Sequence, residues 1–192
     1  MYEAAAHADV LLAETPTNPG LDVVDLHGLA TTCRSHAATL VIDNTAATPL
    51  AQQPVAAGAD LVMASATRGL SGHGDLLAGY VAATKADLME AMAAERLLAG
   101  PILGAFEAWL LLCSLCSASL RFERQCRNAL ALATMLRGHP AVRSVRYPGL
   151  PDDPSYSVAS TRMRRFTRIS LGVEDTDDLL ADVEQALDSA GR

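Results

Sequence analysis

The chain has 192 residues, of which 50% are hydrophobic and 19% charged, and its formal net charge is -7. The hydrophobic content permits a sizeable core and excludes global disorder. The negative net charge excludes a basic nucleic-acid surface. No apolar run approaches the roughly 20 residues of a membrane span. Because the N-terminus lacks the basic start of a signal peptide and the four cysteines are interpreted as reduced thiols, we expect a soluble cytoplasmic protein.

Short apolar runs in the first half of the chain predict strands over 9–13, 39–43, 60–64 and 76–82. Helices are expected over 26–37, with Asp25 as a candidate N-cap, and over 85–98. The segment 14–20 contains two prolines and is expected to be irregular. Strands that alternate with helices predict a parallel or mixed sheet with helices on its faces.

The second half of the chain is predicted to be mainly helical. A long helical pattern runs from 101 to 137 and is interrupted over 114–119. The remaining elements are expected to be a strand over 142–148, a helix over 156–165, a strand over 167–171 and a helix from 176. A domain boundary is expected between 121 and 140, although the part after it is small for an independent core.

Polar segments follow three of the predicted strands, where ligands gather in open α/β sheets. Asp43 offers a carboxylate that can pair with a protonated ring nitrogen. Ser65 and Thr67 offer hydroxyls beside glycines, which suits an anion, and Asn18 offers an amide for a phenolic oxygen. A carboxylate for a pyridinium, donors for a phosphate and an amide for a hydroxyl together predict a site for pyridoxal 5'-phosphate.

Several motifs in the same order identify a family resemblance that covers nearly the whole chain. The chain resembles the transsulfuration family, the pyridoxal-phosphate enzymes of cysteine and methionine metabolism that include cystathionine γ-lyase and γ-synthase. The motifs are Glu14-Thr-Pro-Thr-Asn-Pro19, Val41-Ile-Asp-Asn-Thr45, Ser65-Ala-Thr-Arg-Gly-Leu-Ser-Gly-His-Gly-Asp75, Ala129-Leu-Ala-Leu-Ala133, Tyr147-Pro-Gly-Leu150 and Arg168-Ile-Ser-Leu-Gly-Val-Glu-Asp175.

The resemblance implies an α/β fold, that of fold-type I pyridoxal-phosphate-dependent transferases (aspartate-aminotransferase-like). It also implies an N-terminally truncated chain with a shortened C-terminal domain. Residues 1–125 would be a remnant of the cofactor-binding large domain, and 126–192 the shortened small domain. The implied activity is that of a carbon–sulfur lyase or transferase, acting on a sulfur-containing amino acid and with no nucleic-acid or membrane partner.

By the same resemblance, Asp43 would pair with the pyridine nitrogen of the cofactor. Ser65 and Thr67 would hold the phosphate, Asn18 would contact the ring hydroxyl, and Thr45 would support the cofactor. Arg168 would bind the carboxylate of the substrate. The alternative for Arg168 is a surface position, because the connection before it is shortened in this chain.

Arg68 departs from the family pattern at the catalytic position. The family motif ends Ser-Ala-Thr-Lys, and its lysine forms the Schiff base with the cofactor. A guanidinium stays protonated and does not form the imine. Lys85 is the only lysine of the chain and is expected at the surface. We therefore expect an impaired or inactive enzyme.

Two alternatives from other classes stay open. The first is a noncatalytic module that pairs with a full-length relative through the long helices around Trp109. The second is a nonfunctional remnant. If the chain is an enzyme, we expect a homo-oligomer. Among the other candidates, His73 is expected to be structural or solvated. Cys113 and Cys116 are expected to be thiols in a helical core rather than a metal pair.

Overall fold

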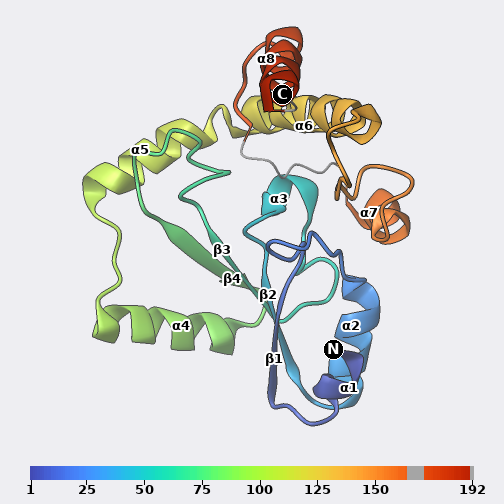
Figure 1. Cartoon of the computed structure of the whole chain (residues 1–192). Coiled ribbons are helices and arrows are strands. Elements are labelled where there is room, and N and C mark those ends of the chain that lie inside the picture. The colour runs from blue at the N-terminus through green and yellow to red at the C-terminus, as the bar shows by residue number, and fades with distance from the viewer. Residues whose placement is uncertain (164–170, 191–192) are drawn as a thin grey trace.

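The computed structural model describes residues 1–163 and 171–190, and its centre is a four-stranded sheet in the order β1-β2-β3-β4 (Figure 1). The strands are β1 (Val10–Glu14), β2 (Thr39–Asp43), β3 (Leu61–Ser65) and β4 (Gly79–Ala83). The pairs β1–β2 and β2–β3 are parallel, whereas β4 is antiparallel to β3. The mixed sheet predicted from the alternating pattern is thus confirmed.

The described residues form helices before, between and after these strands. The helices are α1 (Tyr2–Ala5), α2 (Leu26–Ser35), α3 (Thr48–Ala51), α4 (Ala86–Ala99), α5 (Ala105–Leu115), α6 (Ala118–Gly138), α7 (Tyr156–Arg162) and α8 (Thr176–Ala190). The short helices α1 and α3 were not predicted. Figure 1 shows α2 beside β1 and β2, α4 below β3 and β4, and α6 across the top with α8 packed on it.

The predicted interruption of the long helical pattern is a bend of 60° between α5 and α6. Within the described residues, no single helix has the length and apolar composition needed to cross a membrane. The bent pair α5–α6 meets that requirement only when its two helices are taken together.

One core cluster lies between α2 and the sheet. Leu29 and Cys33 lie on the same side of α2, and both are buried against the fully buried Leu40 and Ile42 of β2. Full burial of a leucine or isoleucine side chain contributes about 1.5–3 kcal/mol. The helical spacing was predicted to continue to Ala37, but α2 ends at Ser35 because Ala37 has a φ of 57°, in the left-handed region.

Asp25 occupies the N-cap position of α2, as predicted, but its side chain makes no capping hydrogen bond. Its Oδ1 instead lies 3.5 Å from Nε of Arg162, at the end of α7. A long-range ion pair has therefore replaced the local contact that sequence suggested.

A second core cluster joins α6 and α7 to the segments before and after β2. Phe122 and Ala129 of α6 pack with Leu21, Ala51 and Tyr147. These residues come from both sides of the predicted division at 125/126, and α6 runs through that point. The division stays a prediction.

The predicted strand over 142–148 is wrong, because this segment pairs with no strand among the described residues. Its backbone is held by a side chain: Tyr147 N donates to Asp153 Oδ2 at 2.9 Å. Arg146 forms ion pairs with both Asp22 and Asp153, which ties the segment to the N-terminal half. The two valines of this segment, Val142 and Val145, favoured a strand, but hydrogen bonds to the Asp153 side chain need no neighbouring strand.

Two further boundaries differ from the predictions. β4 begins at Gly79 instead of residue 76, because Ala78 is already hydrogen-bonded to the turn that follows β3 through Ala66 N. Helix α7 ends at Arg162, whereas the predicted helix reached residue 165. Most of the predicted strand over 167–171 lies outside the described residues, and Leu171 is not in a strand.

Asp153→Ala should destabilise the fold by about 2–3 kcal/mol, because the buried amides of Tyr147 and Ser155 would lose their acceptor. The Asp153 side chain is 1% exposed. The measurement is the free energy of unfolding in urea. Asp152→Ala is the matched control, since Asp152 is an exposed neighbour whose ion pair with Arg137 lies at the surface; equal losses in the two variants would contradict the prediction.

Candidate active site

A chain of hydrogen bonds links the carboxyl ends of β2 and β3. Thr45 N donates to Asp43 Oδ1 at 2.9 Å, Ser65 N donates to Thr45 Oγ1 at 2.9 Å, and Thr67 N donates to Ser65 Oγ at 3.2 Å. Parallel strands end at the same edge of a sheet, so residues that follow them are neighbours. The structure thus brings together four of the residues that the sequence singled out.

Three of these four residues, Asp43, Thr45 and Ser65, line one cavity of about 860 Å³. Met63 and Val81 of the sheet form part of its apolar lining, and α4 closes another side. The volume lies within the range of about 300–1,000 Å³ typical of small-molecule sites. A large apolar cavity with a few convergent polar groups is the arrangement expected of a cofactor or substrate site.

Thr67 uses its hydroxyl within the protein. Its Oγ1 donates to Ala78 O at 3.2 Å and accepts from Ala78 N at 3.1 Å, which closes the loop between β3 and β4. Thr67 lines a neighbouring cavity of about 600 Å³, together with Asp75 and Glu107. Ser65 and Thr67, which the sequence analysis treated as a pair, therefore line different cavities.

Asn18 and Arg168 are not brought to this cavity by the described structure. Asn18 is exposed, does not line the cavity of Asp43, and donates its backbone N–H to Glu14 Oε2 at 3.1 Å. Arg168 lies outside the described residues. The roles assigned to both residues stay predictions.

Arg68 is exposed in the turn that follows β3, and its carbonyl accepts from Gly72 N at 2.7 Å. It lines neither the cavity of Asp43 nor the neighbouring cavity of Thr67. The turn holds its shape through backbone contacts that do not involve the Arg68 side chain.

Arg121 of α6 supports the loop that carries Arg68, and sequence analysis missed it. Its Nη2 donates to Leu70 O at 2.8 Å and to Ser114 O at 2.9 Å, and its Nε donates to Ser117 Oγ at 3.1 Å. Burial lowers the pKa of Arg121. No local signal could reveal this contact, because Leu70 and Arg121 are 51 residues apart.

His73 is structural, as expected. Its Nδ1 lies 2.6 Å from Ser71 O and 3.3 Å from Ser114 Oγ, so the ring joins the loop to α5. The expectation that Cys113 and Cys116 are core thiols is wrong, since both are exposed on α5 and its end. Among the described residues, no group of three or more potential ligands could hold a metal ion.

Lys85 lies at the opposite end of the sheet from Arg68. Because β4 is antiparallel to β3, Ala83 pairs with Leu61, at the start of β3, and Lys85 follows Ala83. Lys85 is exposed, as predicted, and its Nζ is 2.6 Å from Asp60 Oδ1. The hydrogen bond to Asp60 raises the pKa of Lys85, so even less of its amine is unprotonated. Lys85 does not line the cavity of Asp43.

A buried amide network behind the site was also missed. Asn44 Nδ2 donates to Gln52 O at 3.0 Å, and Gln52 Nε2 donates to Thr15 O and to Asn44 Oδ1, both at 3.1 Å. The network joins the ends of β1 and β2 to the end of α3. It holds the backbone beside Asp43, although none of these three side chains lines the cavity.

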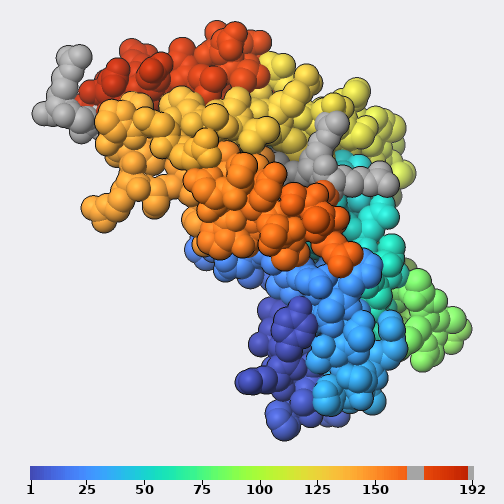
Figure 2. Space-filling model, turned by 90° about the vertical axis from the view of Figure 1, so that its right-hand side faces the viewer, coloured from blue at the N-terminus to red at the C-terminus, as the bar shows by residue number. Residues whose placement is uncertain are grey.

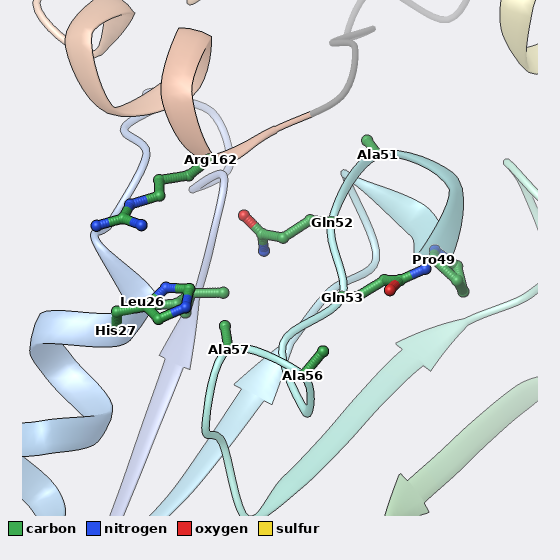
Figure 3. A pocket seen from close by; sticks show the side chains of 9 residues that line it. All are labelled: Leu26, His27, Pro49, Ala51, Gln52, Gln53, Ala56, Ala57 and Arg162. Atoms are coloured by element: carbon green, nitrogen blue, oxygen red, sulfur yellow. The ribbon is translucent and has the colours of Figure 1, made fainter.

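Figure 3 shows a third cavity, of about 190 Å³, on the far side of this network. It lies between α2, the segment 49–57 and Arg162, and the Gln52 side chain extends toward it. None of the predicted cofactor residues lines it. The larger cavity beside Asp43 is therefore the candidate site.

The family description "Cys/Met metabolism PLP-dependent enzyme", where PLP is pyridoxal phosphate, matches residues 3–169. The chain belongs to this family. It is 39% identical to a putative cystathionine gamma-lyase of Streptomyces coelicolor, over 94% of this chain and 59% of that protein. It is 34% identical to an L-methionine gamma-lyase of Pseudomonas putida, over 93% of this chain and 61% of that protein.

The same relationship holds in three dimensions. A crystal structure of an apo methionine gamma lyase from Micromonospora echinospora matches with a TM-score of 0.92 and 32% identity, over 97% of this chain and 65% of that chain. The expected fold of the fold-type I pyridoxal-phosphate enzymes is thus confirmed, and the cofactor of the family is pyridoxal phosphate. The chain spans 59–65% of the length of these relatives.

Gly72→Ala should destabilise the loop of Arg68 more than Gly74→Ala does. Both glycines have a positive φ (72° and 69°), so alanine costs about 1–2 kcal/mol at either. Only at Gly72 would the new Cβ collide with the guanidinium of Arg121, whereas a Cβ at Gly74 would have nothing within 4 Å. We expect about 1–3 kcal/mol of additional destabilisation for Gly72→Ala.

The measurement is urea unfolding of both variants, with hydrogen exchange of the amides of 66–78. Faster exchange in Gly72→Ala than in Gly74→Ala would show that the arginine contact supports the loop. Identical exchange in the two variants would count against that role of Arg121.

Proposed function

We propose that this chain holds part of a pyridoxal-phosphate site at the carboxyl ends of β2 and β3. The substrate of this site would be a sulfur-containing amino acid. Because residue 68 is an arginine, the chain would lack efficient carbon–sulfur lyase or transferase activity. The observation that carries the proposal is the shared cavity of Asp43, Thr45 and Ser65. Family membership supplies the cofactor, and the cavity volume accommodates a small molecule.

The residues of the cavity fit such a cofactor. Asp43 uses Oδ1 for Thr45 N, and within the described residues no donor is bonded to its Oδ2, which leaves an acceptor for a protonated ring nitrogen. The hydroxyls of Thr45 and Ser65 accept backbone bonds and keep their own protons for donation to an anion. Thr67 would act on the phosphate only if its hydroxyl left Ala78.

When bound, pyridoxal phosphate withdraws electrons from the bonds at the α-carbon of an amino acid. The carboxylate of Asp43 would hold the ring nitrogen in its protonated form, and Ser65 would orient the phosphate. Met63 and Val81 would keep water from one side of the ring. Arg168 stays the proposed ligand of the substrate carboxylate.

The proposed site lacks a neutral amine at residue 68. In the family, this residue both attaches the cofactor and moves protons; a guanidinium does neither efficiently. Loss of a positioned acid–base group costs roughly 10²–10⁴ in rate. The chain is therefore proposed to bind the cofactor reversibly and to turn over substrate poorly.

Arg68→Lys should increase covalent retention of pyridoxal phosphate, because it restores an amine at the turn after β3. After borohydride reduction and desalting, intact and peptide mass spectrometry should find the cofactor on residue 68 of this variant and not on residue 68 of the unmodified chain. Arg143→Lys, which adds a lysine at an exposed position in the C-terminal part, is the matched control.

Equal retention in Arg68→Lys and Arg143→Lys would refute the proposed site. Turnover of a thioether amino acid by the unmodified chain alone would instead refute the proposed loss of activity. Label on Lys85 is expected to be weak and equal in all three proteins, because its amine is paired with Asp60.

Asp43→Asn in the Arg68→Lys background should weaken cofactor binding by about tenfold or more, because a charge-assisted hydrogen bond contributes about 1.5–3 kcal/mol. Asparagine keeps an oxygen acceptor for Thr45 N, so the local backbone should be preserved. Equilibrium dialysis with pyridoxal phosphate measures the change. Asp75→Asn, at the neighbouring cavity, is the control; a similar loss in both variants would mean that Asp43 has no specific role.

A further inference from the structure

The small cavity behind the buried amide network lies between α2, the segment 49–57 and Arg162 at the end of α7 (Figure 3). Figure 2 shows the orange surface of α7 directly against the blue surface around α2. The cavity has a volume of about 190 Å³ and shares no lining residue with the cavity of Asp43. Most of its wall is apolar and consists of Leu26, Pro49, Ala51, Ala56 and Ala57. The cavity is thus separate from the proposed cofactor site in position and in lining.

Gln52 presents a hydrogen-bond acceptor to this cavity. The residue is 4% exposed, and its Nε2 donates to Thr15 O and to Asn44 Oδ1, both at 3.1 Å. Because a backbone carbonyl such as Thr15 O can only accept, the amide nitrogen of Gln52 must face the network and its oxygen must face away from it. Within the described residues no donor is bonded to Gln52 Oε1, and the side chain extends toward the cavity (Figure 3). A buried acceptor without a donor is uncommon, which points to a ligand that supplies one.

Arg162 supplies a positive charge to the same cavity. Its guanidinium has five N–H donors, and its ion pair with Asp25 joins Nε to Oδ1 at 3.5 Å. In the part of the chain that the structure describes, no acceptor is bonded to either Nη group of Arg162. Figure 3 shows this guanidinium and the ring of His27 on one side of the cavity, with the Gln52 amide opposite. Two available Nη groups suit a carboxylate, which a guanidinium binds with two parallel hydrogen bonds.

The size and charge of the cavity define the ligand further. Its volume of about 190 Å³ is about six times the roughly 30 Å³ that one water molecule occupies in the liquid, so it holds a ligand of about six non-hydrogen atoms. None of the described lining residues is acidic, whereas Arg162 is a cation, so a neutral hydroxyl is favoured over an ammonium as the donor to Gln52. We propose that this cavity binds a small 2-hydroxy carboxylic acid of the size of lactate, with its carboxylate on Arg162 and its hydroxyl on Gln52 Oε1.

The test titrates the whole chain with lactate and three matched compounds, followed by NMR of the backbone amides. Propionate lacks the hydroxyl, lactamide lacks the charge, and alanine carries an ammonium in place of the hydroxyl. Lactate should shift the signals of 26–27 and 51–53 but not those of 63–65 and 79–81, which line the cavity of Asp43. Each analogue should bind at least about tenfold more weakly, because each leaves a polar group of the cavity unpaired or adds a like charge.

Arg162→Gln should weaken lactate binding by at least about tenfold, since it removes the cation. Arg137→Gln is the matched control: both arginine side chains are 46% exposed and each pairs with an aspartate, but Arg137 lies on α6 and does not line the cavity. Circular dichroism checks that both variants fold. If Arg162→Gln does not fold, the four compounds on the unmodified chain decide the question.

Four results would overturn the proposal. The first is that lactate shifts no signals, or shifts only those beside Asp43. The second is that propionate or lactamide binds as well as lactate, and the third is that alanine does. The fourth is equal lactate affinity in the two folded arginine variants.

Discussion

The parallel pairing of β2 with β3 is the constraint on which the candidate site depends. Because the two strands run in the same direction, the polar residues that follow them meet at one edge of the sheet. Thr45 makes the connection, since its amide donates to Asp43 and its hydroxyl accepts from Ser65 N. The buried Leu40 and Ile42 hold β2 against α2, so Asp43 follows a strand that is anchored in the core.

The conformation of the loop after β3 does not depend on the side chain at position 68. Its conformation depends on backbone hydrogen bonds, on the Thr67 hydroxyl and on Arg121, which reaches Leu70 from α6. The Arg68 side chain contributes none of these contacts and is exposed. In our proposal, arginine at this position leaves the loop intact and removes the amine on which the chemistry depends.

Apolar side chains are divided unequally between core and surface. Leu29 of α2 is fully buried, whereas Leu97 of α4 is 75% exposed. The two helices differ in burial: α2 buries four residues, Leu26, Leu29, Ala30 and Cys33, whereas α4 buries none in the described structure.

The periodicity and motifs of the sequence were sufficient to predict the sheet class and the main helices. They also predicted the grouping of Asp43, Thr45 and Ser65, because residues that follow neighbouring parallel strands lie together. They could not indicate that Thr67 turns to Ala78, that Arg121 supports the loop, or that 142–148 is held by Asp153 instead of a strand. Each of these depends on which groups meet in space to satisfy a hydrogen bond. For Arg121 the partner lies 51 residues away, and no local pattern encodes such a meeting.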